Sequence, residues 1–195
     1  MRQARVDRKT RETDISLTLL LDGAGKADIH TGVGFLDHML ELLAFHGGFD
    51  LAVSCAGDTR VDDHHSVEDI GIALGKAFSE ALGDKKGIRR YGQFLLPMDE
   101  ALVLCAVDLC GRDTLGWQMQ LPSQKVGSFD TELAQEFMLA FVRNAGAAAH
   151  FVQLAGQNTH HILEAAFKGF GRALGQAVSL DENRINETPS SKGVL

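Results

Sequence analysis

The sequence predicts an α+β protein made of two similar halves, each a mostly antiparallel sheet with helices on one face. Three observations support this prediction. The motif His-His-x-x-Glu occurs at His64–Glu68 and again at His160–Glu164, 96 positions later. Matching residues flank the two copies in the same order. Each copy also follows the same succession of strand-like and helix-like segments, which indicates an internal duplication.

Residues outside the motifs extend the match between the halves. Small residues follow both motifs at one spacing: Gly75, Ala77 and Ala81 in the first copy, and Gly171, Ala173 and Ala177 in the second. Glu12 and Gly23 match Glu100 and Gly111, each 88 positions later. We therefore expect a first half over residues 1–84, a second half over 88–180 and a C-terminal tail over 181–195, which together form one compact unit.

The elements of each half are expected in the same order. Apolar and β-branched residues predict strands at 15–21 and 101–107. Apolar residues spaced three and four apart predict helices at 36–45 and 131–144. Short strands are expected at 51–56 and 151–155, and a second helix should begin at each motif and run to about Leu82 or Val178. The tail, which contains Pro189 and two serines, is typical of a loop.

The composition restricts the partners and the compartment. A net charge of −7 argues against nucleic acid or an anionic membrane as a partner. The three cysteines lie in apolar runs and are expected to stay reduced. The longest apolar run, Ala101–Val107, is far shorter than the ~20 residues that span a bilayer, and no signal peptide is visible. A cytoplasmic protein is therefore expected.

The two motifs predict metal binding. Histidine and glutamate four residues apart share one face of a helix, with Cβ atoms roughly 5–6 Å apart, so both can reach one ion. The adjacent histidine points about 100° away around the helix and is available to another site. The repeat also places Glu136 opposite His38, and carboxylate and imidazole can replace one another as ligands. Eight candidate ligands result: His38, His64, His65, Glu68, Glu136, His160, His161 and Glu164.

Eight ligands would hold two ions with four ligands each. Imidazole with carboxylate suits Mn, Fe, Co or Zn, and a six-coordinate ion with open positions favours Mn. A second group is cationic and could bind phosphate: Arg89, Arg90, Arg112, Lys168 and the tail segment Ser190-Ser191-Lys192. The alternative for Lys168 is an exposed i,i+4 pair with Glu164. Glu12 could be a general base or only a charge at the end of a strand.

Four segments together resemble the imidazoleglycerol-phosphate dehydratases of histidine biosynthesis: Gly34–Leu40, Asp62–Asp69, Asn158–Ala165 and Pro189–Lys192. The resemblance covers essentially the whole chain. It implies a duplicated ribosomal-S5-domain-2-like fold and a homo-oligomer of 24 subunits with active sites at subunit interfaces. It also implies two Mn²⁺ ions per active site and a small phosphorylated substrate.

The resemblance assigns roles to individual residues. All the candidate ligands except Glu136 match the family's ligands, and many members have a histidine at the position of Glu136. The expected substrate contacts are Glu12, His38, His46, His64, Glu68, Arg90, Arg112, His160, Lys168, Ser190, Ser191 and Lys192. Glu12 and His46 are the expected proton-transfer groups.

The reaction implied is the dehydration of D-erythro-imidazole-glycerol phosphate to imidazole-acetol phosphate. An imidazolate held between two cations could help to expel the hydroxyl and give a diazafulvene-like intermediate, while the bound phosphate fixes orientation. Two other classes fit the ligand motifs. A metal-dependent hydrolase would use the same ions to activate water, and a non-catalytic metal-binding assembly would bind them without turnover.

Overall fold

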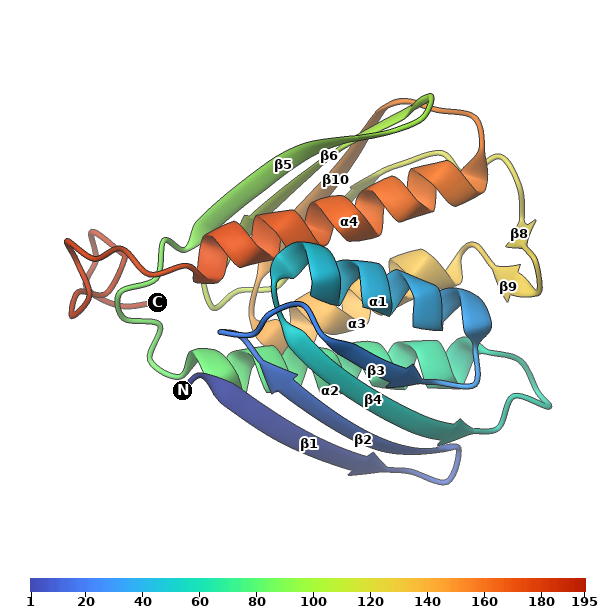
Figure 1. The fold of residues 1–195 in the computed structure, drawn as a ribbon, viewed down its shortest axis with the longest axis horizontal. Coiled ribbons are helices and arrows are strands. Elements are labelled where there is room, and N and C mark those ends of the chain that lie inside the picture. The colour runs from blue at the N-terminus through green and yellow to red at the C-terminus, as the bar shows by residue number, and fades with distance from the viewer.

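The computed structural model describes residues 1–195 as two four-stranded sheets with four helices between them. Figure 1 shows the sheets on the two outer sides of the molecule and the helices in the middle. The helices of each half cover their own sheet, and the helices of the two halves pack against one another. The layer order is therefore sheet, helix, helix, sheet, around one continuous apolar core.

The first half contains four strands and two helices. In chain order these are β1 (Gln3–Lys9), β2 (Thr13–Leu20), β3 (Ala27–His30), α1 (Gly34–Gly47), β4 (Asp50–Gly57) and α2 (His64–Leu82). The sheet order is β1-β2-β4-β3, and β3 is the one strand that pairs in parallel.

The second half repeats this arrangement and adds a small hairpin. Its elements are β5 (Tyr91–Met98), β6 (Ala101–Asp108), β7 (Thr114–Gln118), the pair β8 (Lys125–Val126) and β9 (Phe129–Asp130), α3 (Leu133–Ala145), β10 (Ala148–Ala155) and α4 (Thr159–Val178). The sheet order is β5-β6-β10-β7, with β7 parallel to β10. The two sheets have the same topology, which confirms the predicted α+β class and its duplicated halves.

Apart from the short β8–β9 hairpin, the strands that the sequence failed to predict share a position. β2, β4, β6 and β10 were predicted and are the central strands, whereas β1, β3, β5 and β7 were missed and are the edges of the two sheets. Edge strands carry polar and charged residues that discourage further pairing, so the apolar alternation that marks a strand is weak. The sequence of β1, Gln-Ala-Arg-Val-Asp-Arg-Lys, is a clear case.

Glycines set how closely the helices of the two halves approach. A Cβ atom on Gly75 of α2 would lie 2.5 Å from the carbonyl oxygen of Phe141 in α3, and one on Gly171 of α4 would lie 2.6 Å from that of Leu43 in α1. The two glycines are repeat counterparts, so Phe141 and Leu43 are counterparts too. The same offset of 98 positions relates Glu136 to His38. Helix packing therefore supports the pairing of Glu136 with His38 independently of the motifs.

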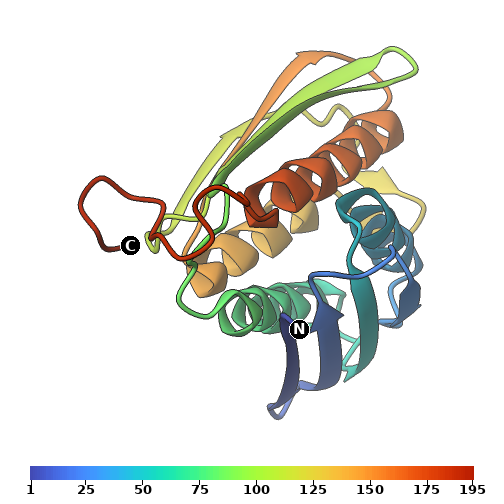
Figure 2. The ribbon, with the colours of Figure 1, turned by 60° about the vertical axis from the view of Figure 1, so that its left-hand side comes forward.

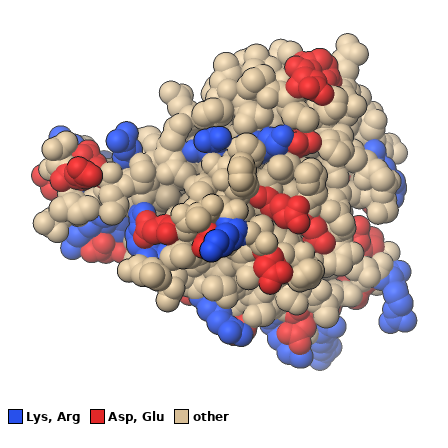
Figure 3. Space-filling model, in the orientation of Figure 1, with Lys and Arg blue, Asp and Glu red and all other residues tan.

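The tail and the surface complete the description. From residue 181 the chain loops out beyond the C-terminal end of α4 (Figure 2). On the face drawn in Figure 3, lysine and arginine are interspersed with aspartate and glutamate and form no single basic area. None of the helices combines the length and apolar character that crossing a bilayer requires. The three cysteines are unpaired.

Candidate functional site

The structure brings three of the candidate ligands together where α1 packs on α4. His38, His160 and Glu164 each offer one ligand atom, and these atoms lie within 4.8 Å of one another. His160 Nε2 lies 3.1 Å from Glu164 Oε2. The Asn158 side chain fixes where α4 starts, because it accepts hydrogen bonds from the backbone N–H groups of His160 and His161. Two imidazoles and a carboxylate converging in this way form a donor set for a divalent transition metal.

Glu164 is the buried member of this cluster. Burial raises the pKa of its carboxyl, but the hydrogen bond and charge of Lys168, with His38 and His160 nearby, outweigh burial and leave the pKa below its usual value. The carboxylate is thus held ionised, which is the state that binds a cation. The Lys168–Glu164 pair exists as an i,i+4 pair, but its side chains are only 17% and 10% exposed, so the exposed pair considered from the sequence is wrong.

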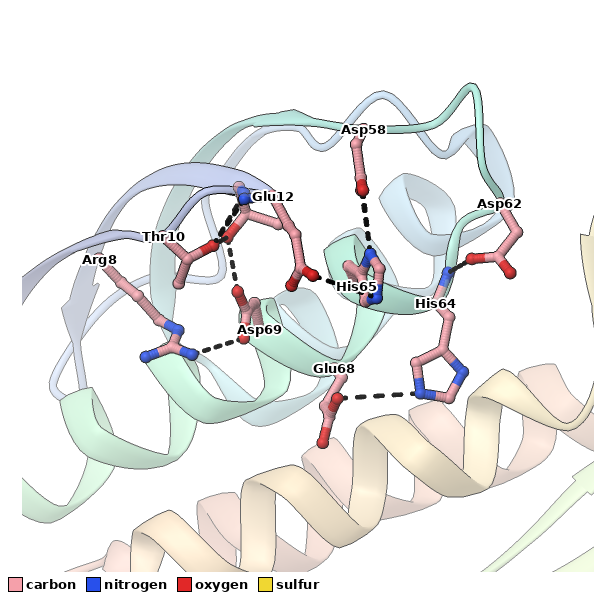
Figure 4. A network of polar contacts seen from close by, with 10 residues as sticks. Arg8, Thr10, Glu12, Asp58, Asp62, His64, His65, Glu68 and Asp69 are labelled. Atoms are coloured by element: carbon pink, nitrogen blue, oxygen red, sulfur yellow. Dashed lines mark hydrogen bonds and ion pairs between the residues drawn. The ribbon is translucent and has the colours of Figure 1, made fainter.

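A second group of candidate ligands lies where α2 packs on α3. His64 Nε2 is 3.8 Å from Glu68 Oε2, and Figure 4 shows both side chains on one side of α2. Glu136 is half-buried on α3 at the position that corresponds to His38 on α1. The ligand atoms of these three side chains are less closely gathered than those of the first cluster, which is the only group whose ligand atoms all approach within 4.8 Å.

The second histidine of each motif points elsewhere, as the helix geometry predicts. The ring planes of His64 and His65 make an angle of 81° with centroids 6.2 Å apart, and those of His160 and His161 make an angle of 82° with centroids 6.3 Å apart. His65 Nδ1 lies 3.0 Å from Asp58, and His161 Nδ1 lies 2.7 Å from Glu100.

These carboxylates hold the pKa of each of the two histidines above its ordinary value, chiefly through the hydrogen bond. The same contact, with two backbone N–H groups, lowers the pKa of Glu100 to about 2. Both effects stabilise the charged form of each partner.

Glu12 lies at the tip of the β1–β2 hairpin, close to the first motif. Its carboxylate is exposed and approaches His65 Nε2 at 3.7 Å. The hairpin is fastened to α2 because Arg8 Nη2 donates to Asp69 at 2.7 Å (Figure 4). Thr13 Oγ1 also donates to Asp69, at 2.5 Å. Glu12 is therefore held beside a metal motif but makes no hydrogen bond through its carboxylate.

His46 occupies the last turn of α1. Its Nδ1 is buried and has no hydrogen-bond partner. Burial lowers the pKa of His46, and the positive charges of Arg172 and Lys168 lower it further. The ring is therefore favoured in its neutral form, which can accept a proton.

The remaining candidates for binding phosphate lie at the other end of the molecule. Arg90 donates to Asp108 at 2.7 and 3.1 Å and to the Pro189 carbonyl oxygen at 3.0 Å, so it anchors the tail. Arg112 is exposed in the loop after β6. Ser190 accepts a hydrogen bond from the Gly193 N–H within an exposed turn of the tail that also contains Ser191 and Lys192.

One chain does not bring the two groups together. The ligand motif starts α4, whereas the tail follows its end (Figure 1). A helix of 20 residues is about 30 Å long at 1.5 Å per residue. A small substrate cannot bridge that distance.

The sequence missed three residues that shape the site: Asp58, Asp69 and Glu100. The repeat had already paired Glu100 with Glu12, so its place beside a motif histidine could have been found from that match. Asp69 ends one of the segments that resemble the family but was given no role, and no periodicity or motif distinguished Asp58. The partners of both residues come from other elements of the fold.

Comparisons with known proteins agree with this geometry. The profile of the family described as "Imidazoleglycerol-phosphate dehydratase" matches residues 31–174. Proteins with that name from Desulforamulus reducens and a Jannaschia species are 57% and 55% identical over all of this chain and 98% and 100% of their own lengths.

Solved structures add the three-dimensional match. The Staphylococcus aureus imidazoleglycerol-phosphate dehydratase superposes with a TM-score of 0.84 at 42% identity, covering 92% of this chain and 99% of that one. The Pyrococcus furiosus enzyme, solved in complex with (S)-C348, has a TM-score of 0.84 at 39% identity, covering 97% and 100%. The chain is therefore a hydro-lyase that belongs to the imidazoleglycerol-phosphate dehydratase family.

Proposed function

We propose that this chain dehydrates D-erythro-imidazole-glycerol phosphate to imidazole-acetol phosphate in histidine biosynthesis. The observation that carries the proposal is the convergence of His38, His160 and Glu164 at the α1–α4 contact, in a chain of this family. The repeat supplies a matching set on α2 and α3. A substrate that contains an imidazole ring suits a site built for two cations.

The donor set fits Mn²⁺, two ions per active site, because imidazole and ionised carboxylate are ligands that this metal accepts. His38, His160 and Glu164 would belong to one ion, and Glu136, His64 and Glu68 to the other. His65 and His161 contact Asp58 and Glu100 instead of their own clusters, and they would complete sites built with a neighbouring chain. When bound, the ions would act as Lewis acids that stabilise the substrate's ring as an imidazolate.

The chain's own residues would move the protons. The ring would expel the hydroxyl, which would leave as water with the proton that the ring N–H gave up, and a diazafulvene-like intermediate would remain. A proton would then leave the neighbouring carbon and be returned to the ring, and the resulting enol would become the ketone of imidazole-acetol phosphate. Glu12 is the base for that carbon proton, because its carboxylate is exposed beside the first motif and has no hydrogen-bond partner. His46 offers a neutral ring for the second transfer. Lys168 pairs with the candidate ligand Glu164, so its ammonium group would lie beside the metal and could contact the substrate there.

We also propose that active sites form between subunits of a 24-subunit assembly. The distance between the metal motifs and the tail supports this, because one small substrate needs both. A neighbouring chain would bring Arg90, Arg112 and the residues Ser190, Ser191 and Lys192 to bind the phosphate, which fixes the substrate's orientation. Chelation should then reduce the size of the assembly measured by light scattering, and Mn²⁺ should restore it. An unchanged size after verified metal removal would contradict sites that bridge subunits.

Turnover of imidazoleglycerol phosphate by the purified protein tests the function. We expect imidazole-acetol phosphate to form with Mn²⁺ and activity to disappear with chelator. Glu12→Gln should lower kcat by about 10²–10⁴-fold at normal metal content, since it removes the base and leaves the ligands. A product that has gained rather than lost water would favour the metal-dependent hydrolase. Metal binding without any turnover would favour the non-catalytic assembly.

A further inference from the structure

The second histidine of each motif is held by one ring nitrogen only. His65 Nδ1 bonds Asp58 and His161 Nδ1 bonds Glu100, at 3.0 and 2.7 Å. The opposite nitrogen, Nε2, has a carboxylate no nearer than 3.7 Å in His65 and 3.6 Å in His161, which is longer than a hydrogen bond. Each half thus fixes Nδ1 and leaves Nε2 available.

The carboxylate of Glu100 is fully occupied. One oxygen accepts hydrogen bonds from the backbone N–H groups of Gln157 and Asn158, at 3.1 and 2.8 Å, and the other accepts from His161. Glu100 therefore connects the β5–β6 hairpin to the start of α4 with three bonds. Its repeat counterpart, Glu12, has no such bonds through its carboxylate. The two glutamates occupy the same position in the repeat and have diverged in what they contact.

A carboxylate on Nδ1–H has a known effect on a histidine that binds metal. It keeps the proton on Nδ1, presents the Nε2 lone pair to the cation, fixes the plane of the ring and makes Nε2 more basic. A free imidazole in water samples both tautomers and all ring orientations. Glu100, held by the backbone of the helix that carries His161, removes that freedom.

We propose that Glu100 is the positioning residue of His161, and that it holds the ring in the tautomer and orientation that bind the metal. The inference rests on the proposed metal role of His161. Glu100 acts through the histidine and does not itself take part in the proton transfer assigned to Glu12. In the first half the same task falls to Asp58, which comes from the loop after β4 instead of from the hairpin.

Two readouts test the proposal in the full-length, metal-stripped protein. Titration with Mn²⁺ should show affinity about 10–100-fold weaker in Glu100→Ala, with a smaller loss in Glu100→Gln, which retains an acceptor oxygen without the charge. Nitrogen-15 NMR at alkaline pH should find the single ring proton of His161 on Nδ1 in the native chain. In Glu100→Ala it should find a mixture of the Nδ1–H and Nε2–H tautomers. A structural role alone would not move the tautomer.

Asn158→Ala is the matched control. It removes the side-chain cap of α4 but leaves Glu100 and the His161 ring in place. We expect a lower melting temperature and unchanged Mn²⁺ affinity. If Asn158→Ala weakened Mn²⁺ as much as Glu100→Ala, the loosened helix start would explain the loss and the proposal would be overturned.

His161→Ala separates this inference from the proposed function. If it lost Mn²⁺ while Glu100→Ala bound as tightly as the native chain, the positioning role alone would fail. If His161→Ala bound Mn²⁺ like the native chain, the metal role of His161 would fail and the inference would fall with it. A native His161 protonated on Nε2 would also overturn it.

Discussion

Each half has a β-hairpin with a glutamate at the same repeat position, Glu12 or Glu100. The contacts that join the hairpin to its helix, called the joint below, are polar in the first half and apolar in the second. The β1–β2 hairpin of Glu12 is joined to α2 by Arg8, Thr13 and Asp69 through charged hydrogen bonds. At the corresponding positions the β5–β6 hairpin and α4 have Leu96, Ala101 and Ala165, which are 7%, 1% and 0% exposed. The joint of the first half is therefore polar, whereas the residues at the same positions in the second half are apolar and buried.

The difference teaches how a duplicated site divides its tasks. The hairpin with the apolar joint binds α4 a second way, through the carboxylate of Glu100. The hairpin with the polar joint needs no such bonds from Glu12, because Asp69 already fastens it. The polar joint therefore leaves the carboxylate of Glu12 without hydrogen bonds and available to react. The carboxylate of Glu100 instead binds His161 and the backbone at the start of α4.

Loss of a motif histidine should have the largest effect, and it should be equal in both halves. His64→Ala and His160→Ala each remove a ligand from one of two matched clusters. We expect each to lower kcat/KM by more than the ~100-fold that loss of a ligand's hydrogen-bonding partner typically costs. Steady-state kinetics with measured metal content checks this. Normal turnover in either variant at full metal content would break the equivalence of the halves.

The polar joint should contribute to stability on a scale of a few kcal/mol. Asp69→Ala leaves Arg8 and Thr13 without their acceptor, which should lower the free energy of unfolding by about 1–3 kcal/mol. The triple variant Arg8→Leu/Thr13→Ala/Asp69→Ala installs the apolar joint of the second half. It should recover most of that loss, because replacing all partners leaves no unsatisfied group.

Urea denaturation of the native, single and triple proteins measures both effects. Asp14→Ala, which removes an exposed ion pair with Lys9, is the control and should change stability by less than about 0.5 kcal/mol. A triple variant less stable than Asp69→Ala would show that the two joints are not interchangeable.

The smallest effect concerns His46 and acid. Its pKa is below the usual value, so the unfolded chain binds a proton there more readily than the folded one. The stability that depends on a neutral His46 is complete above the unfolded pKa of about 6.5 and declines as the pH falls below it. From about pH 7.5 to about pH 5.5 the native protein should therefore lose more unfolding free energy than His46→Gln. Equal losses would mean that burial and the charges of Arg172 and Lys168 do not act on His46.

The sequence revealed what depends on local pattern or on repetition. The central strands were predicted from apolar and β-branched residues, the helices at 36–45 and 131–144 from apolar spacing, and the other two helices from their position at the recurring motifs. The motif histidines and glutamates were predicted from their recurrence. The edge strand β1 was missed because most of its side chains are polar or charged. Asp58 and Asp69 were missed because a carboxylate's role depends on which distant element packs against it. Glu136 is intermediate: the repeat suggested its place, and the glycine contacts of α2 and α4 support it.

The central claim is that the chain carries two matched clusters, with Glu136 in the place of His38. Manganese bound per chain, with its affinity, tests this most directly. We predict two ions in the native protein, two in Glu136→His and in the reciprocal His38→Glu, and a weakened second ion in Glu136→Gln, because a neutral amide is a poorer ligand than a carboxylate. One ion per native chain, or equal stoichiometry and affinity in the native chain and Glu136→Gln, would contradict it.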